Sequence, residues 1–155
     1  MKLNLNLPPP PPQNNAVLGP TYPTPGAGGP RLTQQDAQSQ LGAAHIRFQG
    51  APRLEGVQQK AIDEVINLKT ICGGSSCDVV VNSATGGSHN SGTCSHANGW
   101  KIDVDDTPSV NNYILKNFQD TGINRSDDGA RLYNAPSGAT YARESGHWDI
   151  QVPCI

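Results

Sequence analysis

The sequence lacks any cluster of lysine and arginine and any long apolar run. Its 155 residues carry 11 basic and 13 acidic side chains, for a net charge of -2. Binding to a nucleic acid or an anionic membrane surface requires a concentrated basic patch, so neither partner is expected. No stretch approaches the roughly 20 apolar residues of a transmembrane span. The N-terminus also lacks the apolar core and small-residue cleavage site of a secretory signal, so we expect no signal peptide.

Residues 1–50 are rich in proline and glycine and read as an extended arm. Proline fixes φ and has no backbone donor, which favours polyproline II over packed structure. Leu3, Leu5 and Leu7 alternate with asparagine, a period that suits either a strand added to the sheet edge of a partner or a disordered segment. We expect this arm to dock on a protein assembly. The prolines of the arm are Pro8 to Pro12, Pro20, Pro23, Pro25 and Pro30.

Residues 51–155 carry the periodicities of one small α+β domain. Apolar residues at spacings of three and four predict a helix that ends near Thr70, and Thr107 followed by Pro108 predicts the start of a second helix. Valine-rich or alternating segments predict the strands, which are residues 78–82, 100–104, 131–134, 140–143 and 144–152. The expected fold is a small antiparallel sheet with two helices, preceded by the arm. The expected buried faces are Leu54, Val57, Ala61, Val65 and Leu68 in the first helix and Val110, Ile114, Leu115 and Phe118 in the second, which should stop at Gly122.

The four cysteines allow two interpretations. Cys72 and Cys77 are close enough to close a small loop, and Cys94 with Cys154 could join the C-terminal end to the histidine-bearing loop. Such disulfides persist outside the reducing cytosol. The alternative is four reduced, partly buried thiols.

Side chains that bind metals are concentrated in two short segments, residues 88–103 and 144–148. Together these hold three of the four histidines and one of the three glutamates. In the alternating run that starts at Trp100, Asp103 would point away from the apolar face of its strand, and the same alternation places His147 on a polar face.

These side chains predict a metal site. With His96 from the adjoining loop, Asp103 and His147 supply the three protein ligands of a catalytic zinc site, which leaves the fourth position to water. A metal ion lowers the pKa of that water to about 7. Glu144, three residues before His147, is placed to accept the proton of the metal-bound water.

At these residues the sequence resembles the zinc D-Ala-D-Ala peptidases of family M15, which share their fold with the hedgehog signalling domain. The family pattern is roughly Ser-x-His-x-x-Gly-x-Ala-x-Asp followed by Glu-x-x-His. The segment from Cys94 to Asp103 matches it at His96, Gly99 and Asp103, and Glu144-Ser145-Gly146-His147-Trp148 matches the second half. The likeness covers roughly residues 52 to 152.

The resemblance implies a hedgehog/DD-peptidase-like fold, Zn2+ held by His96, Asp103 and His147, and Glu144 as the catalytic base. The family arginine that polarises the substrate carbonyl is absent after the turn at Ser83, so His89, Arg143 or the metal alone would have to stabilise the charge of the transition state.

The function that the resemblance implies is cleavage of the peptide stems of bacterial peptidoglycan, as an endopeptidase or a D,D-carboxypeptidase. We favour an endopeptidase of the phage-lysin or virion-associated type, present in the virion or host cytoplasm and acting in the bacterial periplasm and cell wall. One alternative is a non-catalytic, metal-binding attachment module of a phage particle. Another is a thiol hydrolase with Cys94 as nucleophile and His147 as its base.

Overall fold

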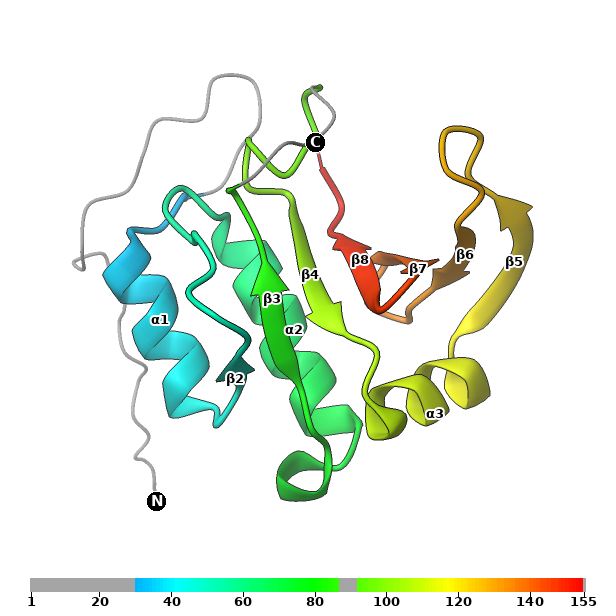
Figure 1. The fold of residues 1–155 in the computed structure, drawn as a ribbon, viewed down its shortest axis with the longest axis horizontal. Coiled ribbons are helices and arrows are strands. Elements are labelled where there is room, and N and C mark those ends of the chain that lie inside the picture. The colour runs from blue at the N-terminus through cyan, green and yellow to red at the C-terminus, as the bar shows by residue number, and fades with distance from the viewer. Residues whose placement is uncertain (1–29, 87–91, 155) are drawn as a thin grey trace, which may run out of the picture.

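The computed structural model describes residues 30–86 and 92–154, which form three α-helices and one seven-stranded sheet (Figure 1). The helices are α1 (Gln34–Ala43), α2 (Gln59–Ile71) and α3 (Pro108–Asn117), with a short 3-10 helix η1 (Gly74–Ser76). The strands are β2 (Arg47–Phe48), β3 (Val80–Ser83), β4 (Lys101–Asp105), β5 (Gln119–Asn124), β6 (Arg131–Asn134), β7 (Thr140–Glu144) and β8 (His147–Gln151). Their order across the sheet is β2-β3-β4-β8-β7-β6-β5.

The α+β class is confirmed, but the sheet is mixed and has more elements than predicted. Strand β2 pairs with β3 in parallel, and every other pair is antiparallel. A parallel pair needs a long crossover connection, and helix α2 supplies it here. The purely antiparallel sheet and the count of two helices were wrong, because β2 and α1 lie in residues assigned to the arm.

The folded domain begins by residue 30, so the arm boundary at residue 50 was also wrong. Thr33 caps α1 by accepting a hydrogen bond from the backbone of Asp36, and Leu41 of this helix is fully buried. Leu32 exchanges backbone hydrogen bonds with the segment at Val57. Only two residues of α1 are buried, so its apolar period is too sparse to read in the sequence. Residues 1–29 lie outside the described residues, and docking by the arm stays a prediction.

The two predicted helices are confirmed, with corrections in both. All five residues of the predicted stripe of the first helix are buried, but α2 begins at Gln59, so Leu54 and Val57 lie in the chain before it. Helix α3 starts at Pro108 behind the Thr107 cap. It stops at Asn117, because Phe118 already has extended dihedral angles and leads directly into β5, which contains Gly122. Leu115 is 44% exposed, since the buried stripe of this helix runs through Val110 and Ile114.

The sheet has a helix-covered face and an open face. Tyr141 on β7 donates a hydrogen bond to Glu64 on α2 (2.6 Å), and Trp148 on β8 donates one to Asn111 on α3 (2.7 Å). Tyr141 and Trp148 point to the same face of the sheet, so these contacts place α2 and α3 on that face. Because side chains alternate along a strand, Glu144 on β7 and His147 and Asp149 on β8 point to the opposite face. None of the helices in the described part of the chain has the length and apolar character needed to cross a bilayer.

All four cysteines form disulfides, Cys72 with Cys77 and Cys94 with Cys154. The second bond joins the loop before β4 to the chain that follows β8. These are the two disulfides considered in the sequence analysis, whose connectivity the sequence could not fix, and the alternative of reduced thiols does not hold. Because Cys94 has no free thiol, the thiol-hydrolase alternative loses its nucleophile.

Candidate metal centre

Two buried carboxylates face each other at the centre of the open face of the sheet. Asp103 on β4 and Asp149 on β8 are directly paired across the antiparallel strands, and each residue is 5% exposed. Like charges at directly opposed positions repel. Burial adds the cost of removing each carboxylate from water. Such a pair therefore requires a bound cation or a proton.

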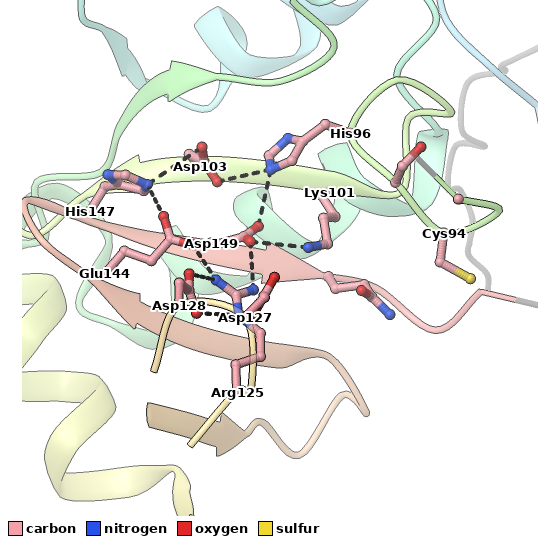
Figure 2. Close-up of a pocket in the computed structure, with 13 residues that line it drawn as sticks. Cys94, His96, Lys101, Asp103, Arg125, Asp127, Asp128, Glu144, His147 and Asp149 are labelled. Atoms are coloured by element: carbon pink, nitrogen blue, oxygen red, sulfur yellow. Dashed lines mark hydrogen bonds and ion pairs between the residues drawn. The ribbon is translucent and has the colours of Figure 1, made fainter. Parts of the chain in front are cut away.

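His96 completes the cluster from the loop that precedes β4. Its Nδ1 atom donates a hydrogen bond to the carbonyl oxygen of Ala84 (2.8 Å), so the neutral ring presents the lone pair of Nε2 to the carboxylates. Nε2 lies 3.4 Å from Asp103 Oδ1 and 3.2 Å from Asp149 Oδ1 (Figure 2). The imidazole is 6% exposed, so bulk water reaches it poorly.

These three residues meet the requirements of a metal site. Asp103 Oδ1 and Asp149 Oδ1 are buried without a hydrogen-bond partner of good geometry. One ligand atom from each of His96, Asp103 and Asp149 lies within 4.8 Å of the other two. In a tetrahedral site with bonds of 2.0–2.1 Å, ligand atoms are about 3.3–3.4 Å apart, close to both measured contacts of His96. The triad could therefore hold a metal ion.

The electrostatics of the cluster favour a cation at the same place. Burial, reinforced by the charge of Asp149, raises the pKa of Asp103 to about 7, although His96 and His147 partly oppose the rise. Burial alone would lower the pKa of His96, but its contact with Asp149 and the charge of Asp103 outweigh burial and raise it. Burial likewise acts to raise the pKa of Asp149, and His96, Arg125 and Lys101 overcome it, so that this pKa is well below its usual range. The raised pKa values of Asp103 and His96 mean that this cluster holds its protons to a higher pH than isolated side chains do.

Glu144 and His147 lie beside the triad. They are cross-strand neighbours in the β7-β8 hairpin, whose turn contains Gly146 at φ +86°, a conformation that favours glycine. Glu144 Oε1 is 2.6 Å from His147 Nε2, and that nitrogen is 3.7 Å from Asp103 Oδ2. The structure thus brings the four predicted residues together. The compact ligand cluster, however, contains Asp149 in the place expected for His147, and ligation by His147 stays a prediction.

Two cationic side chains contact the same site, Arg125 from a distant part of the chain and Lys101 from the strand that carries Asp103. Arg125, in the loop between β5 and β6, donates from Nη1 to Asp149 Oδ2 (2.9 Å) and also contacts Glu144. Lys101 on β4 donates to the same oxygen of Asp149 (3.1 Å). The site opens into a cavity of about 530 Å³ lined by Gly92, Cys94, Ser95, His96, Lys101, Asp103, Arg125, Asp127, Asp128, Glu144, His147, Asp149 and Gln151.

Of the two predicted replacements for the family arginine, the structure describes only Arg143, and this residue does not lie beside the triad. Arg143 is exposed on β7, with its guanidinium 5.5 Å from the Trp148 ring, and it lines a neighbouring cavity instead. It was misassigned because Arg143 and Glu144 are adjacent in a strand and therefore point to opposite faces. His89 lies outside the described residues.

Sequence reasoning missed Asp149, Lys101 and Arg125 as members of the site. Asp149 alternates with Trp148 exactly as His147 does, and its pairing with Asp103 depends on strand register, which the sequence does not reveal. No local sequence pattern marks Arg125 as a site residue, because the β5-β6 hairpin brings it to the site from a distant part of the chain.

No family model, curated protein or solved structure matches this chain. The likeness to family M15 therefore rests on His96, Asp103, Glu144 and His147 and on their proximity in the fold.

Proposed function

We propose that this protein is a zinc-dependent peptidoglycan hydrolase of the M15 peptidase type, with a hedgehog/DD-peptidase-like fold. The observation that supports this function is the buried triad of His96, Asp103 and Asp149, which leaves two carboxylate oxygens without hydrogen-bond partners next to an open cavity. A structural ion would need no such access. Zinc is the proposed metal because it accepts imidazole nitrogen and carboxylate oxygen together.

Each residue of the site has a role in hydrolysis of an amide. A bound zinc ion supplies Lewis acidity toward water and the scissile carbonyl. Glu144 accepts the proton of the attacking water and delivers it to the leaving amine. Its Oε1 atom is on the side of His147 and the triad, which is where that water would lie. The cavity of about 530 Å³ is within the range of ligand sites and is lined by polar groups that suit a peptide.

The substrate is proposed from the resemblance. Peptide stems of bacterial peptidoglycan are the expected substrates, cut by endopeptidase or D,D-carboxypeptidase action. The proline-rich segment, residues 1–29, would attach the enzyme to a phage particle or another assembly, with action in the bacterial periplasm and cell wall.

Substitution of Glu144 tests the proposal. Glu144→Gln keeps the shape of the side chain but removes the proton acceptor, so digestion of purified peptidoglycan should fall by about 10²- to 10⁴-fold. Glu55→Gln is the matched control, because Glu55 lies outside the cavity. Soluble products are identified by mass spectrometry, which also distinguishes the two cleavage types. Equal digestion by wild type and Glu144→Gln would refute the role of Glu144.

A non-catalytic, metal-binding attachment module is the second candidate. It is favoured by one observation: the guanidinium nearest to the triad, that of Arg125, is already engaged by Asp149, Asp128 and Glu144 and does not replace the family arginine as a free donor. Wild-type protein that binds one zinc ion per chain but releases nothing from peptidoglycan would support this candidate over the hydrolase.

A further inference from the structure

Arg125 forms four ion pairs at the site, with Asp127, Asp128, Glu144 and Asp149. It lies in the loop from Arg125 to Ala130 that joins β5 to β6, far in sequence from both metal-binding segments. Its guanidinium contacts Asp128, Asp149 and Glu144, and its side chain is 22% exposed. Figure 2 shows its guanidinium below Asp149 and next to Asp128.

The loop holds this guanidinium in one orientation. Arg125 donates its backbone N–H to Ala130 O (2.8 Å) and accepts one from Gly129 (2.8 Å). Asp128 binds the side chain through both oxygens, at 3.0 Å from Nε and 2.5 Å from Nη2. Asp128 is itself fixed by the backbone N–H of Ala130 (3.0 Å). Two parallel hydrogen bonds between arginine and a carboxylate set direction as well as distance.

The Nη1 and Nη2 atoms of the guanidinium also orient Asp149 and Glu144. Nη1 binds Asp149 Oδ2, which Lys101 also binds, so Oδ1 is the oxygen left to face His96 and Asp103. Nη2 binds Glu144 Oε2, so Oε1 is left to face His147. In each carboxylate, one oxygen is held by the arginine and the other points toward the metal centre.

We infer that Arg125 is the positioning residue of the metal centre, which holds Asp149 as a metal ligand and Glu144 as the base. The part that concerns Glu144 rests on the proposed function, whereas the part that concerns Asp149 does not. The positive charge of Arg125 would by itself oppose a cation, but Asp128 and Glu144 offset that charge. When Arg125 is removed, the lost orientation of Asp149 should therefore weaken metal binding more than the lost positive charge strengthens it.

The test compares Arg125→Gln with Arg131→Gln in the full chain. Arg131 belongs to the same β5-β6 hairpin but pairs with Asp120 on the surface, outside the cavity, which makes it a matched control. Zinc affinity is measured by competition with a chromophoric chelator, and the ligand field is measured from the visible spectrum of the Co2+ form. Arg125→Gln should bind zinc about 10- to 100-fold more weakly, the usual cost of losing a group that orients a ligand. Its Co2+ spectrum should change, and Arg131→Gln should match wild type in both.

Two further measurements separate positioning from general damage to the fold. Added guanidinium ion should restore part of the zinc affinity of Arg125→Gln, which it could not do for a misfolded chain. Arg125→Lys should recover less than wild type, because one ammonium cannot bind Asp149 and Glu144 in parallel. Wild-type affinity and spectrum in Arg125→Gln would overturn the inference, even if the protein digests peptidoglycan. Failure of wild type to digest peptidoglycan would overturn the proposed function but leave the difference in affinity standing.

Discussion

At the scale of single residues, the site depends on an asymmetry between two aspartates that face each other. Lys101 and Arg125 both bind one oxygen of Asp149, so this carboxylate stays ionised. Asp103 has no lysine or arginine partner among the described residues, and its two ion-pair partners there are His96 and His147. The unneutralised charge therefore belongs to Asp103, which must bind a proton or a metal ion to be stable in its buried position.

Asp103 should make the metal-free protein less stable as the pH rises. Its pKa is raised in the folded state from 3.8 to about 7, so its stabilising contribution is complete below pH 4 and is lost as the pH rises toward 7. A rise of this size corresponds to roughly 4 kcal/mol of unfolding free energy. Urea denaturation with a chelator present should show this loss between pH 4 and pH 8.

Asp103→Asn supplies the control for that experiment, because the amide has the same shape and does not titrate. At pH 8 the metal-free variant should be more stable than wild type and should not bind zinc. If the variant is less stable than wild type at pH 8, Asp103 is not the destabilising charge.

At the scale of elements, the loop that carries His96 is held in place by its close approach to the start of α2. Gln58 binds this loop through its backbone N–H to Gly99 O (3.0 Å) and through its side chain to Asn98 O (3.1 Å). Gly99 has φ +84°, and a Cβ added there would overlap the carbonyl oxygen of Gly56. Any residue with a side chain at this position would therefore be strained and would collide with the chain before α2.

Gly99→Ala should therefore weaken both folding and metal binding. Backbone strain together with the overlap should cost about 2–4 kcal/mol of unfolding free energy. Displacement of His96 should also lower zinc affinity. Gly50→Ala is the matched control, because Gly50 has φ +69° with open space around its Cα, so it should cost about 1–2 kcal/mol and leave zinc binding unchanged. Equal effects of the two substitutions would show that the close approach at Gly99 is unimportant.

Elements with a strong local period were predictable, and elements that depend on distant partners were not. The stripe along α2 and the alternation in β4 and β8 are set by which side chains must be buried, and the sequence shows this directly. Strand β2 has only two residues, and α1 buries only two. Strand β5 was missed because its side chains are nearly all exposed, so it has no alternation to read.

At the scale of the whole molecule, the helices and the site occupy opposite faces of one sheet. The helices bury the aromatic side chains of β7 and β8, which leaves the polar positions of the same strands free to form the cavity. The sequence predicted His96, Asp103, Glu144 and His147 as neighbours because their motifs resemble a known pattern. Arg125 enters the site only through the β5-β6 hairpin, so no local pattern could have indicated it.

The two disulfides should contribute unequally to this architecture. The bond from Cys94 to Cys154 spans a sequence separation of 60 residues, and that from Cys72 to Cys77 spans 5. In the chain-entropy model, the longer loop should contribute about 4 kcal/mol and the shorter about 2 kcal/mol to the free energy of unfolding. Replacing each pair by serine and measuring denaturation tests this order.

The longer bond should also matter for the metal centre, because Cys94 is two residues from His96 and anchors its loop to the end of β8. The Cys94→Ser, Cys154→Ser variant should therefore bind zinc more weakly than wild type under conditions where both remain folded. The Cys72→Ser, Cys77→Ser variant should bind zinc as wild type does, since its disulfide lies outside the cavity. Equal zinc affinity in both double variants would mean that the contacts of Gly99 and Gln58 alone hold the loop of His96. The bond between Cys94 and Cys154 would then act only on the unfolded chain.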